Sequence, residues 1–258
     1  MQITGNTILI TGGGSGIGRG LAEAFHSLGN QVIIAGRRQQ VLDETVAANP
    51  GMKSAVLNIE NADSIRGFAD RLISDYPQLN AVIHNAGIMR AEDLKACSVA
   101  DAEAIITTNL LGPMRLTAAL LPKLLAQPSA TIMTVSSGLA FVPMAMTPTY
   151  CATKAAIHSY TLSLRYQLKS TSVQVLELVP PYVQTELMGS RQANDPNAMP
   201  LKDFIDETMS ILKNSPDATE ICVERVNRLR LAERNGGYET FFTQFNDTLS
   251  AQRTRESQ

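Results

Sequence analysis

Five glycines fall within seven residues near the start of the chain, between an apolar run and a helical pattern. The run Thr7–Thr11 is short and rich in β-branched residues, which predicts a buried strand. After the glycines, Ile17, Leu21, Phe25 and Leu28 recur at helical spacing. Glycines let a backbone approach a ligand closely, and a helix N-terminus offers free N–H groups and the positive end of its dipole. The stretch therefore predicts a pyrophosphate-binding loop, with a purely structural tight turn as the weaker alternative.

The spacing of the loop is Thr11-Gly12-x3-Gly16-x-Gly18, which differs from the common G-x-G-x-x-G pattern. The cofactor-binding candidates in it are Gly12, Gly14, Ser15, Gly16, Ile17 and Gly18.

Two arginines follow the second predicted strand, Val32–Ala35. An acidic residue near this point holds the ribose 2′-hydroxyl of NAD in dinucleotide folds, whereas an arginine accommodates the 2′-phosphate of NADP. Here the acid is absent, and Arg37 and Arg38 stand in its place. Guanidinium groups match phosphate by paired hydrogen bonds. We predict NADP(H), with Arg37 as the primary contact, Arg38 as the second candidate and NAD(H) as the alternative cofactor; the arginines could also simply cap a solvated strand end.

Strands and helices alternate along the rest of the chain. We expect further strands at 52–57, 81–84, 130–135, 173–179 and 219–223, and helices over 38–48, 61–76, 101–127, 150–168 and 201–213, with a bend at Gly112-Pro113. This rhythm predicts an α/β fold: a three-layer Rossmann fold whose doubly wound parallel sheet of about seven strands carries helices on both faces. Ligands of such sheets bind beyond the carboxyl ends of the strands.

Tyr150 and Lys154 are four residues apart, which places both on one face of a helix. An ammonium beside a phenol favours phenolate and typically lowers its pKa by roughly 1–3 units. The pair is therefore a candidate for proton transfer. A Tyr-x3-Lys pair alone also arises by chance on solvated helices, so the neighbouring motifs decide whether this pair is functional.

Composition excludes several classes of function. The 258 residues are 44% hydrophobic, 18% charged and carry a net charge of −2, which gives a sizeable core and no general attraction to nucleic acid. No apolar run approaches about 20 residues, so no membrane-spanning helix is predicted, and no signal peptide is evident. Cys97, Cys151 and Cys222 fit neither a disulfide framework nor a zinc site, and the histidines show no ligand-like spacing, so we predict no metal and a cytoplasmic location.

In combination, these motifs resemble the single-domain short-chain dehydrogenase/reductase family over roughly residues 5–190. The glycine loop, Asn85-Ala86-Gly87 and the Tyr150-x3-Lys154 pair are similar to its motifs, although His84 stands where another asparagine is usual. The resemblance implies a catalytic tetrad of Asn109, Ser137, Tyr150 and Lys154; Ser137 is chosen over Ser136 because it lies 13 residues before Tyr150.

The resemblance also implies roles. Tyr150 would be the general acid or base, Ser137 would hydrogen-bond the substrate oxygen, Lys154 would bind the nicotinamide ribose, and Asn109 would hold a water of a proton relay. Other implied cofactor contacts are Asn58 and Ile59 near the adenine, Asn85, Ala86 and Gly87 beside the ribose, and Pro180, Val183 and Thr185 near the nicotinamide, in addition to Tyr150 and Lys154 themselves.

Two departures mark this chain. Asn58 replaces the usual aspartate, and Pro180-Pro181 replaces Pro-Gly. The Pro-Pro variant resembles the DltE-like branch, named after lipoteichoic-acid D-alanylation loci.

We expect one catalytic domain over residues 1–252, a substrate lid at 186–212 and a frayed end at 253–258. An ending unlike that of the family's tetramers favours a homodimer through the Asn109 and Tyr150 helices. The small-molecule substrate is a carbonyl or secondary alcohol, and methionines such as Met144 and Met188 leave open an apolar one. The alternatives are a catalytically silent dinucleotide-binding regulator or scaffold and a sugar-nucleotide epimerase or dehydratase.

Overall fold

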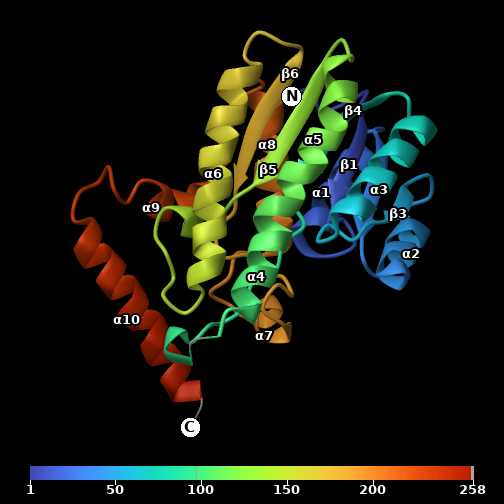
Figure 1. Ribbon diagram of the computed structural model, residues 1–258. Coiled ribbons are helices and arrows are strands. Elements are labelled where there is room, and N and C mark those ends of the chain that lie inside the picture. Colours follow the sequence, from blue (N-terminus) through green and yellow to red (C-terminus); the bar gives the residue numbers. More distant parts are fainter. Residues whose placement is uncertain (97, 257–258) are drawn as a thin grey trace.

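A seven-stranded parallel sheet forms the centre of the computed structural model, which describes residues 1–96 and 98–256 (Figure 1). Its strands are β1 (Thr7–Thr11), β2 (Gln31–Gly36), β3 (Lys53–Val56), β4 (Leu79–His84), β5 (Ala130–Val135), β6 (Val173–Val179) and β7 (Glu220–Cys222). Their order is β3-β2-β1-β4-β5-β6-β7. Strands β2 and β3 are therefore added on one side of β1, and β4 to β7 on the other. The predicted doubly wound Rossmann fold is confirmed, with strand positions close to those expected.

Helices cover both faces of the sheet. They are α1 (Gly16–Ser27), α2 (Gln39–Ala48), α3 (Ala62–Asp75), α4 (Ala100–Ile106), α5 (Gly112–Leu125), α6 (Pro148–Leu168), α7 (Ser190–Asn194), α8 (Leu201–Asn214), α9 (Asn227–Arg230) and α10 (Tyr238–Glu256). Short 3-10 turns lie at Leu94–Ala96 (η1), Gly138–Ala140 (η3) and Glu224–Val226 (η4).

Alternation along the strands divides the core into two halves. Ile8 and Ile10 of β1 pack with α1 and α8, whereas Leu9 between them packs with α3, α5 and α6. Both faces are apolar because both are covered, which explains why the strands read as nearly continuous apolar runs.

The 101–127 region departs from the prediction. A π-helical turn, η2 (Thr107–Leu111), separates α4 from α5, so the irregularity precedes Gly112-Pro113 and contains Asn109. Gly112 is needed here for close packing, because a Cβ would lie 2.6 Å from Ile59 Cγ1. By length and composition Ala100–Leu125 is a candidate membrane span, yet 44% of that window is buried and α5 packs in the core of the sheet.

Two expectations about the C-terminal third need adjustment. Phe204, Ile205 and Leu212 of α8 belong to the core beside α1, so the second half of the 186–212 range is a core helix, and we restrict the proposed lid to 186–200. Helix α10 continues through Glu256, whereas the sequence predicts fraying from Arg253. Good helix formers in this stretch account for the difference. Residues 257 and 258, like Cys97, lie outside the described residues.

Candidate active site

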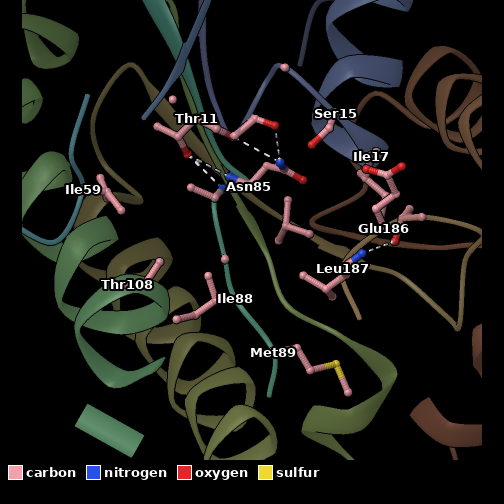
Figure 2. Close-up of a pocket in the computed structure, with 18 of the residues that line it drawn as sticks. Thr11, Ser15, Ile17, Ile59, Asn85, Ile88, Met89, Thr108, Glu186 and Leu187 are labelled. Atoms are coloured by element: carbon pink, nitrogen blue, oxygen red, sulfur yellow. Dashed lines mark hydrogen bonds between the residues drawn. The ribbon is translucent and has the colours of Figure 1, made fainter. Parts of the chain in front are cut away.

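A pocket of about 600 Å³ lies at the carboxyl ends of β1, β2, β4, β5 and β6, within the range of small-molecule sites (Figure 2). It brings together most of the predicted site residues, namely Gly12, Gly14, Ser15, Gly16, Ile17, Arg37, Arg38, Ile59, Asn85, Ala86, Gly87, Ser137, Tyr150, Lys154, Pro180, Val183 and Thr185. Gly18, Asn58 and Asn109 are predicted residues that do not line it.

The N-terminus of α1 opens into this pocket. Within the described part of the chain, Ser15 precedes the helix in an extended conformation without a side-chain cap, and the first turn contains no acidic residue. Its N–H groups and dipole are thus available to an anion. Gly12 has φ +67°, and a Cβ on Gly18 would lie 2.3 Å from the Gly12 carbonyl oxygen. Side chains at these positions would break the turn that presents the helix end.

Thr11 at the end of β1 and Asn85 just after β4 both line the pocket and are hydrogen-bonded to each other (Figure 2). The Asn85 and Ala86 amides both donate to Thr11 Oγ1 at 3.1 Å, and Asn85 Nδ2 donates to the carbonyls of Thr11 at 3.1 Å and Gly12 at 3.3 Å. The loop motif includes Thr11, but the sequence indicates no role for its side chain. The structure shows that its hydroxyl fixes the distance between the glycine loop and the Asn-Ala-Gly segment.

Two arginines and a glutamate surround the end of the pocket near β2. Arg37 Nη1 lies 2.6 Å from Glu60 Oε1, and Glu60 also accepts from Thr108 Oγ1 at 3.1 Å. Arg38 is exposed and makes no salt bridge within the residues that the structure describes. Asn58 stays outside the pocket lining, where its Oδ1 accepts from the Glu60 amide at 3.1 Å. No local pattern indicates that Glu60 competes for Arg37, since the two are joined only by the fold.

Ser137, Tyr150 and Lys154 meet at the opposite end of the pocket. Ser137 precedes η3 at the end of β5, and Tyr150 and Lys154 share one face of α6. Burial raises the pKa of Tyr150 well above its usual range, with a smaller increase from neighbouring Cys151 and an opposing decrease from the Ser137 hydrogen bond. Burial also lowers the pKa of Lys154 to about 8, partly offset by Glu177.

These pKa values correct the expectation that Lys154 lowers the pKa of Tyr150. Lys154 Nζ donates to the Val135 carbonyl at 2.7 Å and lies 5.5 Å from the centre of the tyrosine ring. At that separation the cost of burying a phenolate outweighs the attraction of the ammonium. Tyr150 is therefore a protonated phenol at neutral pH, the form that donates a proton.

Asn109 stands behind the pocket wall, in the π-helical turn. Its Oδ1 accepts from the Ile88 amide at 2.8 Å, and its Nδ2 donates to the Ile88 carbonyl at 2.9 Å and to Thr153 Oγ1 at 3.2 Å. The side chain thus clamps the residues that follow Asn85-Ala86-Gly87 against α6. Irregular helical turns of this kind are frequent at functional sites.

Gln192 of α7 is a lining residue that the sequence analysis did not identify. It is buried, and its Nε2 donates to the Val183 carbonyl at 2.9 Å and to Thr185 Oγ1 at 3.1 Å. Glu186 and Leu187 extend the wall on the same side (Figure 2). Gln192 therefore holds Thr185 in place, a role that no local sequence pattern signals.

His84 ends β4 and is buried between the sheet and α5. Its Nε2 lies 2.8 Å from Thr117 Oγ1, while its Nδ1 has no hydrogen-bond partner among the described residues. Burial lowers the pKa of His84 to about 4, so the ring is neutral at physiological pH. This position joins β4 to α5 and lies outside the pocket lining.

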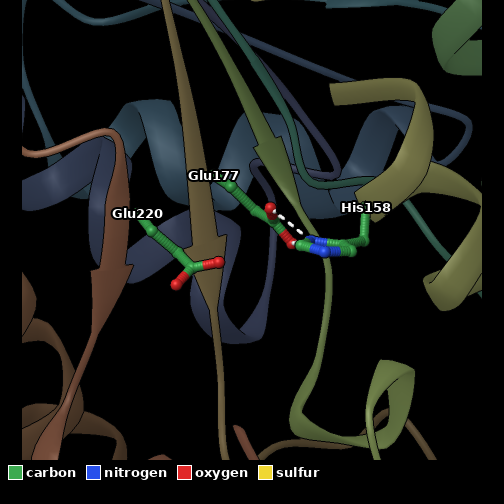
Figure 3. A group of neighbouring side chains, drawn as sticks. All are labelled: His158, Glu177 and Glu220. Carbon is green, nitrogen blue, oxygen red and sulfur yellow. Dashed lines mark hydrogen bonds and ion pairs between the residues drawn. The ribbon is translucent and has the colours of Figure 1, made fainter. Parts of the chain in front are cut away.

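His158 lies one turn beyond Lys154 on α6, in a cluster with Glu177 and Glu220 (Figure 3). The sequence indicates no ligand-like partner for His158, but its Nδ1 contacts both carboxylate oxygens of the fully buried Glu177, at 2.9 and 2.8 Å. Arg230 Nε forms a salt bridge with Glu220 Oε2 at 3.0 Å. Contacts within the protein thus account for all three side chains, and the cluster joins β6 and β7 to α6.

A nicotinamide dinucleotide fits this pocket. The open N-terminus of α1 matches a pyrophosphate, Arg37 and Arg38 line the end of the pocket near β2, and the Ser137–Tyr150–Lys154 group stands at the far end. The residues that would hold the cofactor are those of the glycine loop, the Asn-Ala-Gly segment and Thr185.

Comparisons with known proteins agree with this geometry. A family model described as short chain dehydrogenase matches residues 6–196. The "Uncharacterized oxidoreductase DltE" of Bacillus subtilis (strain 168) is 38% identical over 252 residues, which cover 95% of this chain and 98% of that protein.

Solved structures give the same fold. A short chain dehydrogenase/reductase from Burkholderia phymatum in complex with NAD superimposes with a TM-score of 0.80 at 20% identity, covering 91% of this chain and 95% of that one. The closed form of a serine dehydrogenase complexed with NADP+ superimposes with a TM-score of 0.75 at 27% identity, covering 83% and 91%.

Proposed function

The chain belongs to the short chain dehydrogenase family, in its DltE-like branch, and on that premise we propose an NADP(H)-dependent reductase of carbonyl compounds that also runs in reverse as an alcohol dehydrogenase. Membership makes it a dinucleotide-dependent oxidoreductase, since relatives in this fold bind NAD or NADP+. The observation that carries the finer proposal is that Ser137, Tyr150 and Lys154 line the same pocket as the open N-terminus of α1.

The site divides the chemistry of carbonyl reduction between cofactor and protein. A bound nicotinamide would supply the hydride that adds to the carbonyl carbon. Ser137 holds the carbonyl oxygen, and Tyr150 donates its hydroxyl proton to that oxygen as negative charge develops there. Because the pKa of Tyr150 is raised, its hydroxyl stays protonated until the carbonyl oxygen gains negative charge.

Lys154 then stabilises the phenolate that remains on Tyr150. Both side chains are buried, so the ammonium acts across a medium in which charges interact more strongly than in water. In alcohol oxidation the same groups work in reverse, with Tyr150 as the base. Asn109 positions the Ile88 backbone beside this group, and the water that the resemblance assigns to Asn109 stays a prediction.

Arg37 and Arg38 support a preference for NADP(H), because both line the pocket beside the glycine loop. The Arg37–Glu60 pair moderates that preference, so NAD(H) remains the alternative. Ile88, Met89, Pro181 and Leu187 line the pocket, and Ile88 and Met89 pack in one cluster with Tyr150, which supports a carbonyl substrate with an apolar substituent.

A homodimer through α4, α5 and α6 completes the proposal, together with a cytoplasmic location. Large apolar side chains are exposed on these helices, at Ile106, Leu125, Leu162 and Tyr166. Burying such a surface is favourable and supports association. A monodisperse monomer by light scattering at micromolar concentration would remove the dimer from the proposal.

Oxidation of NADPH in the presence of a panel of aldehydes and ketones tests the function. We expect turnover with wild type and none with Tyr150→Phe, while both proteins bind NADPH with similar affinity. If both proteins bind NADPH but oxidise it at the same background rate, the silent regulator is favoured. Conversion of a substrate without net oxidation of NADPH would favour an epimerase.

A further inference from the structure

The C-terminal helix α10 packs beside the segment that connects Ser137 to the Tyr150 helix, and the function proposed above gives it no role (Figure 1). That segment, residues 138–147, begins with η3 and ends at Thr147, directly before α6. A glycine pair with positive φ, Gly236 at 74° and Gly237 at 69°, turns the chain into α10.

Two side chains of α10 hydrogen-bond the main chain of this segment. Asn246 Oδ1 accepts from the Ala145 amide at 2.6 Å, and Asn246 Nδ2 donates to the Pro143 carbonyl at 3.1 Å. Near the start of the helix, the Tyr238 hydroxyl donates to the Phe141 carbonyl at 3.0 Å. One helix thus binds three backbone groups of a loop that lies outside the sheet.

The short helix before α10 packs against the same segment. Arg230 of α9 places its guanidinium 4.4 Å from the centre of the Phe141 ring while pairing with Glu220. A Cβ on Gly138 would lie 2.8 Å from Leu229 Cδ1, so η3 and α9 are in close contact. Phe141 also meets His158 edge-on, with ring centres 4.8 Å apart, which connects the segment to the cluster of Figure 3.

The inner side of the segment contacts Tyr150. Leu139 and Met144 pack in one cluster with Tyr150, Cys151 and Ile88. The Met144 amide donates to Cys151 Sγ at 3.3 Å. The segment therefore lies between α10 on one side and Tyr150 on the other, and its position is set by both.

Glu92, from the stretch that follows the Asn-Ala-Gly segment, completes the arrangement. Glu92 accepts from the Thr149 amide at 3.0 Å and from Thr149 Oγ1 at 2.8 Å, and its own amide donates to the Met146 carbonyl at 3.0 Å. These contacts fix the C-terminal end of the segment. The contacts of α10 with Phe141, Pro143 and Ala145 hold its middle from the outer side.

We propose that Asn246 and Tyr238 are positioning residues that hold segment 138–147 against Tyr150 and Ile88, which line the pocket, and so shape the wall that these two residues form. The inference rests on the proposed function, because that function places the carbonyl substrate beside Tyr150. It gives the divergent C-terminus a specific role: the helix acts through the loop and touches neither cofactor nor substrate.

Asn246→Ala tests the proposal, with Thr248→Ala as the matched control. Thr248 lies on the same helix, and its hydroxyl donates to the Gln244 carbonyl of that helix, at 2.7 Å, instead of to the loop. Losing two hydrogen bonds to the loop should lower kcat/KM for the best carbonyl of the panel by about ten-fold, with a raised KM and an NADPH Kd within about two-fold of wild type. Hydrogen exchange of peptides covering 141–147 should accelerate in Asn246→Ala alone.

Tyr238→Phe is the second variant if Asn246→Ala folds poorly, since it removes only a hydroxyl. Asn246→Asp keeps the acceptor for Ala145 and should restore part of the exchange protection. Wild-type exchange and wild-type kcat/KM in Asn246→Ala, or equal losses in Thr248→Ala, would overturn the proposal. If wild type reduces no carbonyl, the proposed function fails, and the exchange measurement still decides whether α10 holds the loop.

Discussion

Glu60→Gln should strengthen the binding of NADPH relative to NADH. In the structure Glu60 pairs with Arg37, the guanidinium proposed to hold the 2′-phosphate, at 2.6 Å. Binding of that phosphate requires Arg37 to leave Glu60 or to share its hydrogen bonds. The glutamine keeps the size of the side chain and removes the charge that competes for Arg37.

The exposure of the pair sets the size of the effect. The side chains of Arg37 and Glu60 are 53% and 32% exposed, and ion pairs at such sites contribute about 0.2–1 kcal/mol. Releasing Arg37 should therefore tighten NADPH binding by up to about five-fold and leave NADH binding nearly unchanged. Because salt screens exposed charges, the gain should shrink at high ionic strength.

Arg37→Ala gives the opposite result in the same assay. Loss of a charge-assisted hydrogen bond costs about 1.5–3 kcal/mol, which corresponds to about ten- to hundred-fold weaker binding of NADPH. NADH should be far less affected. In the double variant Glu60→Gln should bring no gain, because the two residues act as one unit.

Fluorescence titration gives the Kd of NADPH and of NADH for each of these variants. Glu44→Gln serves as the control. Glu44 is an acidic residue of α2 that accepts from Gln40 at 3.1 Å, so its replacement changes the net charge equally without touching Arg37. An unchanged NADPH-to-NADH ratio in Glu60→Gln, or the same gain in Glu44→Gln, would refute the reasoning. Equal losses of both cofactors in Arg37→Ala would contradict the 2′-phosphate contact.

Two further predictions concern stability. Burial holds the pKa of His84 at about 4 in the folded protein, against about 6.5 in an unfolded chain. The free energy of unfolding that depends on the neutral ring is therefore fully present above pH 6.5, and about 3 kcal/mol of it is lost as the pH falls from 6.5 towards 4. His84→Asn should flatten this part of the pH dependence of urea unfolding, and an equally steep loss in the variant would place its origin elsewhere. Asn61 accepts from the Ser64 amide at 2.8 Å as the N-cap of α3, so Asn61→Ala should lower the free energy of unfolding by about 1 kcal/mol, whereas an unchanged value would show that the cap adds nothing.

Local patterns are sufficient to predict the parallel sheet. The predicted strands Thr7–Thr11, Ala130–Val135 and Val173–Val179 coincide with the observed ones, because strands buried on both faces are mostly apolar along their whole length. The Asn61 cap is also predictable, since the residue type and the following helical spacing occur together. Such features depend on neighbours in the sequence.

Features that depend on distant residues are not predictable in this way. Glu60 reaches Arg37, Gln192 reaches Thr185, and Asn246 reaches Ala145 only after the chain has folded. The same reason explains the error about Tyr150. Spacing places Lys154 beside it, but burial, which the sequence does not state, decides the direction of its pKa.

Deuteride transfer tests the central claim most directly. NADPH deuterated at the reactive C4 position of the nicotinamide would be mixed with the best carbonyl of the panel, and the alcohol formed would be analysed by mass spectrometry. The account predicts deuterium in the alcohol with wild type, and neither alcohol nor deuterium above background with Tyr150→Phe, although that variant still binds NADPH. An alcohol without deuterium, or equal deuterium transfer by Tyr150→Phe, would contradict it.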